Sequence, residues 1–289
     1  MNKMLLAALA VVSADSHASS KSGDVGPFVD ETWYSGLVDL KDGDDMFYWW
    51  FESRNDAEND PLVLWLTGGP GCASEIALFY ENGPYAFNED GVTLKKNDYS
   101  WNSNANLLYV DQPVGTGFSH AKLLDHVTTE TEVAEDMYMF MSKFLEKYPQ
   151  LKGKDFYITG ESYAGHYIPA ISHYFTFDAP TPLDVNFKGM AIGNGLVDPY
   201  SQYPAYDKFA LENNLIGSAE HAILEAGFKG CQYLIENSIW LIAMEECQIM
   251  TEIILGNPVK PRFNVYDIRE PCDHPPLCYD MSPADNLLL

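Results

Sequence analysis

Four short apolar runs, separated by segments of mixed polarity, constrain what this chain can fold into. They comprise residues 61–66, 105–110, 155–159 and 187–192, and a glycine-containing turn follows each of them. The first run is unbroken, which is typical of a strand that is buried on both faces of a sheet. Because helical segments alternate with the runs, the sequence predicts an α/β protein with a mainly parallel sheet flanked by helices.

Other segments complete the secondary-structure prediction. Residues 32–40 and 45–53 have the pattern of two strands joined by a Lys-Asp-Gly-Asp turn, which predicts a hairpin. Residues 129–147 have helical periodicity and acidic residues in the first turns. From about residue 200 the pattern changes, and residues 206–255 are mostly helical. We interpret this part as a helical subdomain inserted into the α/β core.

The N-terminus has the pattern of a secretory signal peptide over residues 1–18. Lys3 supplies a positive charge, residues 4–12 form an apolar stretch, and Ser16-His17-Ala18 is a small-x-small cleavage site. The alternative is a buried N-terminal helix. A signal peptide implies the secretory pathway, where disulfides form, with the vacuole, the lysosome or the cell exterior as the destination.

The charge balance excludes some classes of partner. The chain has 17 basic and 42 acidic residues, a net charge of −25 and an isoelectric point near 4.4. Such a surface repels phosphate backbones, so nucleic-acid binding is not expected. No later segment approaches the ~20 uninterrupted apolar residues of a membrane span. The acidic composition suits a protein that works at low pH.

The sharpest local motif is Gly160-Glu161-Ser162-Tyr163-Ala164-Gly165, directly after an apolar run. A nucleophile elbow places a serine on a tight strand-to-helix turn between small residues. The strict G-x-S-x-G form is not met because alanine occupies the last position, although alanine is still small. Taken alone, the motif is weak, and an ordinary strand–helix turn would be the preferred interpretation.

Several longer motifs occur together with this one and in a fixed order. They are Trp65-Leu66-Thr67-Gly68-Gly69-Pro70-Gly71-Cys72, Glu81-Asn82-Gly83-Pro84, Asp111-Gln112-Pro113-Val114-Gly115-Thr116-Gly117-Phe118-Ser119, Ile192-Gly193-Asn194-Gly195 and Asn264-Val265-Tyr266-Asp267-Ile268-Arg269. With them the chain resembles the serine carboxypeptidase family, in particular its carboxypeptidase Y-like branch, from about residue 33 to residue 279. The resemblance implies an α/β-hydrolase fold with a helical cap insertion, and a peptidase that cleaves C-terminal residues from peptides or proteins with a free C-terminus.

The resemblance also implies roles for single residues. Ser162 would be the nucleophile, and the backbone N–H groups of Gly69 and Tyr163 would form the oxyanion hole. The positions implied to bind the substrate's C-terminal carboxylate are Trp65, Thr67, Gly68, Glu81 and Glu161. Two crowded carboxyl groups cannot easily both ionise, so one keeps its proton and can donate a hydrogen bond. We therefore expect KM for a peptide with a free C-terminus to rise between pH 5 and 8.

Thr67 departs from the family pattern, in which asparagine is usual. Threonine keeps a hydroxyl donor but has a shorter reach and lacks the second polar atom of the amide. Plant acyltransferases that resemble this family often carry threonine there. Acyl transfer to an alcohol is therefore the alternative to peptide hydrolysis.

The triad Asp and His of an α/β-hydrolase should follow the nucleophile, but no segment resembles their motifs. The later histidines, His166, His173, His221 and His274, do not stand in a glycine-rich turn after a core strand. We expect residues 28–199 to form the first part of the core, 200–280 the insertion and 281–289 a truncated return to the core. On this interpretation the chain is a fragment that hydrolyses peptides poorly or not at all. The alternative is a non-catalytic relative that binds peptides or partners.

Five cysteines remain to be assigned. The resemblance implies pairing of Cys231 with Cys247 and of Cys272 with Cys278, and leaves Cys72 without its partner. The spacing of Cys272 and Cys278 is too wide for a Cys-x₂₋₄-Cys zinc pair. No metal and no cofactor are expected, since hydrolysis by serine needs neither.

Overall fold

The computed structural model describes residues 28–288 except 42, 123–125, 258 and 277. The signal peptide expected at residues 1–18 lies outside the described residues. The strands are β1 (Trp33–Asp39), β2 (Asp45–Phe51), β3 (Leu62–Leu66), β4 (Tyr85–Phe87), β5 (Leu94–Lys96), β6 (Asn106–Val110), β7 (Asp155–Glu161) and β8 (Asn186–Gly193). The chain divides into two compact units, of which the second is Leu196–Met281 and the first is the remainder.

Six strands of the first unit form one sheet in the order β1-β2-β6-β3-β7-β8. Strands β6, β3, β7 and β8 run parallel to one another, and the hairpin β1–β2 joins them through an antiparallel pairing of β2 with β6. The four apolar runs of the sequence are β3, β6, β7 and β8, so the predicted parallel sheet is confirmed. At the opposite edge, β8 alternates between exposed and half-buried residues.

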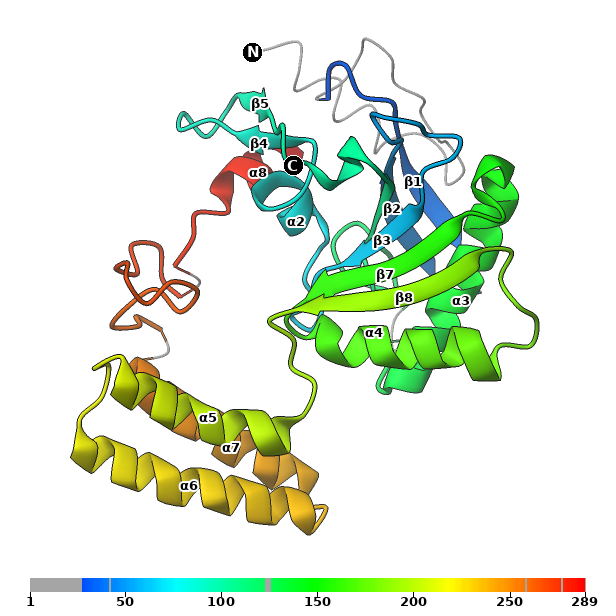
Figure 1. Cartoon of the computed structure of the whole chain (residues 1–289). Coiled ribbons are helices and arrows are strands. Elements are labelled where there is room, and N and C mark those ends of the chain that lie inside the picture. The colour runs from blue at the N-terminus through cyan, green and yellow to red at the C-terminus, as the bar shows by residue number, and fades with distance from the viewer. Residues whose placement is uncertain (1–27, 42, 123–125, 258, 277, 289) are drawn as a thin grey trace. The chain divides into compact units, whose positions relative to one another are not determined.

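Helices cover both faces of this sheet (Figure 1). Those of the first unit are α2 (Glu75–Tyr80), α3 (Glu130–Lys147), α4 (Ala164–His173) and α8 (Ser282–Leu288), together with short turns η1 (Trp101–Ser103), η2 (Pro149–Leu151) and η3 (Tyr174–Asp178). The side chains of α3 and α4 form one apolar core with the sheet, and those of α2 and α8 pack into a second core on the other face. The predicted α/β architecture with flanking helices is therefore confirmed.

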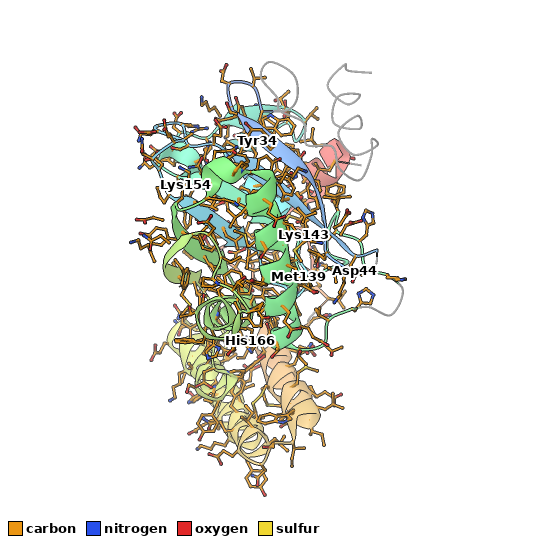
Figure 2. The ribbon with its side chains drawn as sticks, turned by 90° about the vertical axis from the view of Figure 1, so that its right-hand side faces the viewer. Tyr34, Asp44, Met139, Lys143, Lys154 and His166 are labelled. Carbon is orange, nitrogen blue, oxygen red and sulfur yellow. A yellow bond between two sulfur atoms is a disulfide. The ribbon has the colours of Figure 1, made fainter. Side chains whose placement is uncertain are left out.

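Helix α3 shows how the sequence builds these layers. It begins with a capping box, in which Thr129 accepts a hydrogen bond from the Glu132 N–H and the Glu132 carboxylate accepts one from the Thr129 N–H. Val133, Met137, Phe140 and Phe144 recur at helical spacing and are buried against the sheet. The same helix carries Met139, which is half-buried, and the exposed Lys143, both labelled along it in Figure 2.

The described residues of the second unit form three helices, α5 (Pro199–Glu212), α6 (Ser218–Glu236) and α7 (Trp240–Leu255). They pack side by side (Figure 1) around a small core that includes Leu224 and Phe228. A disulfide joins Cys231 of α6 to Cys247 of α7, with the Cα atoms 5.4 Å apart. The helical pattern predicted for residues 206–255 is thus present, divided into three helices.

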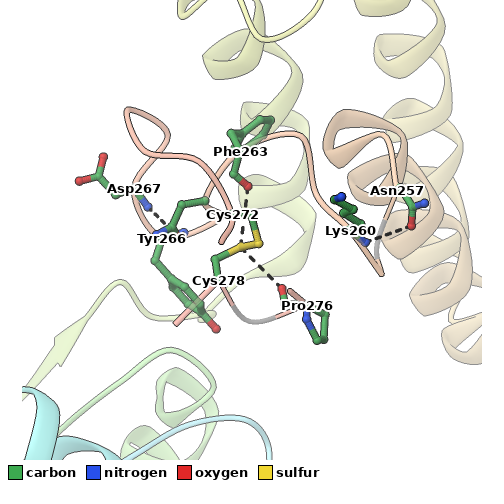
Figure 3. Close-up of a disulfide and its surroundings, with 9 residues drawn as sticks. Asn257, Lys260, Phe263, Tyr266, Asp267, Cys272, Pro276 and Cys278 are labelled. Carbon is green, nitrogen blue, oxygen red and sulfur yellow. Dashed lines mark hydrogen bonds between the residues drawn. A yellow bond between two sulfur atoms is a disulfide. The ribbon is translucent and has the colours of Figure 1, made fainter. Parts of the chain in front are cut away.

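A second disulfide closes a short loop after α7. It joins Cys272 to Cys278, and the Cys278 Sγ atom lies 3.8 Å from the Phe263 carbonyl oxygen and 3.7 Å from that of Pro276 (Figure 3). Both disulfides join the pairs that the resemblance implied. Across the described ranges, no helix combines the length and the hydropathy needed to cross a bilayer.

Candidate active site

Ser162 occupies the tight turn between β7 and α4. Its φ is +59°, in the left-handed region that few residues other than glycine adopt. The turn is held by the Ser162 N–H, which donates to the Gly193 carbonyl at 3.0 Å, and by the Gly165 N–H, which donates to the Ser162 carbonyl at 3.0 Å. The Ser162 side chain is exposed. A strained backbone that presents an accessible hydroxyl is the geometry of a nucleophile elbow.

The small residues around the elbow have a packing reason. A Cβ atom added to Gly160 would clash with the Leu66 carbonyl oxygen of the neighbouring strand, and it would lie only 3.1 Å from the Ala164 Cβ. Only one of the two positions can therefore carry a methyl group. Because Gly160 leaves room, alanine fits at the last position of the motif, and the departure from G-x-S-x-G does not prevent the turn.

The glycine loop after β3 lies directly against the elbow. A Cβ atom on Gly68 would clash with the Tyr163 backbone nitrogen and would lie 2.8 Å from both the Glu161 carbonyl oxygen and the Ser162 Cβ. The next residue, Gly69, has a φ of +113°. The Cys72 N–H donates to the Gly68 carbonyl at 3.1 Å and closes the loop into a turn. The fold thus brings the two expected oxyanion donors, on Gly69 and Tyr163, into neighbouring segments.

Glu81 and Glu161 form a carboxyl pair beside the elbow. Glu81 follows α2 and Glu161 ends β7, so they come from elements far apart in the sequence. Loss of water around the Glu81 carboxyl, with the hydrogen bond to Glu161 and its charge, raises the pKa of Glu81 to about 8. Glu81 still has an exposed side chain, so a ligand can reach it. At acidic and neutral pH, Glu81 keeps its proton and shares it with Glu161.

The segment that carries Glu81 is fixed by its neighbours. The Tyr109 hydroxyl donates to the Asn82 side-chain oxygen at 2.7 Å, and the Trp101 N–H donates to the Asn82 carbonyl at 3.0 Å. Gly83 packs so tightly against the Leu78 carbonyl that no Cβ atom fits there. These contacts explain why Asn-Gly-Pro follows the glutamate.

Trp65 and Thr67 lie at the end of β3, and both are buried. The Trp65 Nε1–H donates to the Thr67 hydroxyl oxygen at 3.1 Å. The hydrogen of the Thr67 hydroxyl is therefore left as a donor for another group. Of the expected carboxylate-binding positions, the structure ties Trp65 to Thr67 and Glu81 to Glu161, and it packs Gly68 on the elbow.

The histidines after Ser162 belong to different segments of the chain. The His166 ring, labelled in Figure 2, stacks on the Tyr163 ring with centroids 4.7 Å apart. His173 lies 3.0 Å from Asp178, and His221 lies 3.0 Å from Asp207 in the second unit. His274 is exposed in the small disulfide loop. The Ser162 side chain makes no hydrogen bond to His166 or His173, the two described histidines after Ser162 that belong to the same unit.

Cys72 lies in the same loop as Gly69 and has no disulfide partner among the described residues. Burial, together with the charge of Glu161, raises the pKa of its thiol, so the thiol stays protonated near neutrality. In the residues that the structure covers, no group of three His, Cys, Asp or Glu side chains could hold a metal ion.

A second acid pair, which sequence reasoning missed, lies in the interior next to the site. Asp111 accepts hydrogen bonds from the Ser74 N–H at 2.8 Å and the Phe118 N–H at 3.0 Å. Glu75 lies against it, and burial together with the charge of Asp111 raises the pKa of Glu75 well above its usual range. Because Asp111 already receives two N–H donors, we place the shared proton on Glu75. Only the burial of Glu75 reveals this pair, because a glutamate in the first turn of a helix is ordinary in sequence.

Comparison with known proteins bears on this site. The sequence model of the family described as serine carboxypeptidase matches residues 24–285. The chain is 44% identical to serine carboxypeptidase S10 family member 1 of Dictyostelium discoideum over 242 aligned residues. These residues make up 82% of this chain and 57% of that protein. It is 38% identical over 271 residues to carboxypeptidase Y of Schizosaccharomyces pombe, which covers 87% of this chain and 27% of that protein.

A solved structure supports the same fold. The crystal structure of a prohormone-processing carboxypeptidase from Saccharomyces cerevisiae superposes with a TM-score of 0.76 at 26% identity, covering 89% of this chain and 61% of that one. The chain spans about half the length of the curated relatives it matches, for example 53% of serine carboxypeptidase-like 49 of Arabidopsis thaliana.

Proposed function

This chain belongs to the serine carboxypeptidase family, and we propose that its site serves to cleave the C-terminal residue from peptides through an acyl-enzyme on Ser162. The observation that carries the proposal is the exposed Ser162 in the left-handed region, next to the paired carboxyls of Glu81 and Glu161. The pair distinguishes a site for a free C-terminus from that of a general esterase.

The proposed reaction uses the site as follows. The Ser162 Oγ attacks the carbonyl carbon of the last peptide bond, and the oxyanion that forms is bound by the N–H groups of Gly69 and Tyr163. The C–N bond then breaks as the leaving nitrogen receives the proton taken from Ser162, and the terminal amino acid leaves. Water hydrolyses the ester, which releases the acyl group as a carboxylic acid and restores the Ser162 hydroxyl. A base must accept the Ser162 proton, and the sequence assigns none.

Recognition of the substrate's C-terminal carboxylate is assigned to groups that can donate hydrogen bonds. These are the Thr67 hydroxyl, the Gly68 N–H and the proton shared by Glu81 and Glu161, with Trp65 orienting Thr67. A free C-terminal carboxyl is ionised above a pH of about 3.5. Binding should therefore be strongest where the ligand is charged and Glu81 is still protonated.

We predict that a peptide with a free C-terminus binds well from about pH 5 to 7 and loses affinity as the pH rises through the Glu81 pKa of about 8. Ionisation of Glu81 removes a donor and adds a second negative charge to the site. The pH range in which affinity is lost therefore lies higher than the range of pH 5 to 8 over which the sequence analysis expects KM to rise. Calorimetric titration of the 289-residue chain with a blocked dipeptide, and with its C-terminal amide as reference, measures the effect without requiring turnover.

Glu81→Gln separates this explanation from a general pH effect. The amide keeps a donor toward Glu161 but cannot ionise, so the loss of affinity above pH 7 should shrink at least tenfold, about one pK unit of interaction energy. Glu146→Gln, on the exposed side of α3, is the matched control and should behave as the unsubstituted chain does. Equal affinity for acid and amide at pH 5 would contradict the proposed substrate class.

Acyl transfer to an alcohol is a second candidate because threonine occupies position 67. The Thr67 oxygen accepts the Trp65 N–H, so the side chain offers one donor where the family's usual asparagine offers two. Incubation of the protein with an activated ester and a mixture of water and an alcohol distinguishes the two. A transesterified product that exceeds the hydrolysed one would favour acyl transfer.

The proposed location is the secretory pathway. Both disulfides lie in the second unit, where the core is small, and such bonds persist in oxidising compartments. The protonated carboxyl pair suits an acidic compartment on this route, such as a vacuole or lysosome, or an acidic exterior.

A further inference from the structure

The two proposed oxyanion donors belong to segments far apart in sequence, and something must fix their separation. Tyr163 precedes α4, whereas Gly69 lies in the exposed loop after β3. A donor contributes fully only when it is held within hydrogen-bond distance of the position that the oxyanion will occupy. We propose that Tyr167 is a positioning residue that holds the Gly69 loop at the correct distance from α4. This inference rests on the proposed function.

The contact that carries the proposal is a single hydrogen bond. Tyr167 lies in α4, is 2% exposed, and its hydroxyl oxygen accepts the Gly71 N–H at 3.1 Å. Gly71 has a φ of +81° and sits inside the turn that the Cys72 N–H closes on the Gly68 carbonyl. Because the turn is only a few residues long, fixing Gly71 also fixes the Gly69 N–H.

The segment that carries the second proposed donor, Tyr163, also contacts Tyr167. The ring of Tyr163 packs against that of Tyr167, with centroids 5.1 Å apart and an interplanar angle of 70°. The Tyr163 hydroxyl also donates to the Glu130 carboxylate, at the start of α3, at 3.3 Å. Tyr167 therefore contacts both segments that carry a proposed donor.

Geometry also indicates that the hydrogen bond does more than stabilise the fold. Gly69, Pro70 and Gly71 are exposed, so water can replace the tyrosine as partner of the Gly71 N–H. A hydrogen bond that water can replace contributes little to the net free energy of unfolding. Water cannot, however, hold the Gly71 N–H at a fixed distance from α4, as the Tyr167 hydroxyl oxygen does.

Tyr167→Phe tests the proposal because it keeps the buried ring and removes only the hydroxyl. We expect hydrogen exchange of the Gly71 amide to accelerate at least tenfold. The rate at which a phosphonofluoridate modifies Ser162 should fall roughly tenfold, because one oxyanion donor is weakened but not removed. In that reaction an O–P bond forms on Ser162, the P–F bond breaks, fluoride leaves, and the serine proton passes to solvent. Tyr138→Phe, which removes a hydroxyl bonded to Thr181 at the surface, is the matched control.

Each outcome decides something. Unchanged exchange at Gly71, or faster exchange with an unchanged modification rate, overturns the proposal. Faster exchange throughout the first unit with a lowered melting temperature assigns Tyr167 to stability and overturns it as well. If the unsubstituted protein is not modified at Ser162, this chain does not activate its serine, in line with the lack of an assigned base, whereas the exchange at Gly71 still decides whether Tyr167 holds the loop.

Discussion

Ser162→Ala is expected to abolish covalent modification of the protein by a phosphonofluoridate. Ser238 is also exposed and left-handed, but within the described chain only Ser162 lies against the glycine loop that carries an expected oxyanion donor, so the loss should exceed a thousandfold. Loss of a nucleophile removes the bond-forming atom itself, whereas loss of one oxyanion donor costs roughly two to three orders of magnitude. Intact-mass measurement and peptide mapping would give the modified fraction and its location.

A control for this substitution is Ser142→Ala, on the partly exposed side of α3. It should leave the modification rate unchanged. Modification of the Ser162→Ala protein at a different serine, at the rate of the unsubstituted chain, would show that the elbow is not the nucleophilic centre.

Gly68→Ala should have the second-largest effect, on stability and on reactivity together. Its methyl group would meet the Tyr163 nitrogen, the Glu161 carbonyl oxygen and the Ser162 Cβ. The first two are backbone atoms, which cannot rotate away as the end of a side chain can. Overpacking of this kind costs about 3 kcal/mol in the free energy of unfolding, and it pushes the loop away from the elbow. Denaturant titration with the phosphonofluoridate assay measures both consequences.

The matched substitution is Gly189→Ala in β8. This glycine lies within a strand of the main sheet, and an added Cβ meets no atom within 4 Å. Stability should change by less than about 1 kcal/mol, and in the favourable direction if the loss of chain entropy in the unfolded state dominates. A Gly68→Ala protein as stable as Gly189→Ala would contradict the close packing of the loop on the elbow.

The parallel strands could be predicted from sequence because each is an apolar run that is followed by a glycine-containing turn. The sequence did not indicate α2 or the hairpin of β4 and β5. Helix α2 is too short for a helical period, and its Glu75 is buried where an exposed acid is expected. The three residues of β4 and of β5 do not provide an alternating pattern.

The candidate site also contains residues that could be identified from the sequence and others that could not. Ser162 and the glycines could be identified because backbone geometry restricts which residues fit there. The proximity of Glu81 to Glu161 follows from the fold, since 80 positions separate them in sequence and only the resemblance connected them. Tyr167 looks in sequence like any apolar residue of an amphipathic helix, and its hydroxyl gains a role only when the Gly71 loop lies over it.

The interior pair of Glu75 and Asp111 has a consequence for the energetics of the whole first unit. Burial raises the pKa of Glu75 above the value it has in an unfolded chain, so between the two pKa values the folded protein holds a proton that the unfolded chain has released. Unfolding in that pH range is therefore a proton-releasing reaction. The stabilisation is fully present below the pKa of glutamate in the unfolded chain. It is lost as the pH rises from that value through the raised pKa of Glu75 in the folded protein. The molecule is thus better suited to persist in acid than a net charge of −25 alone suggests.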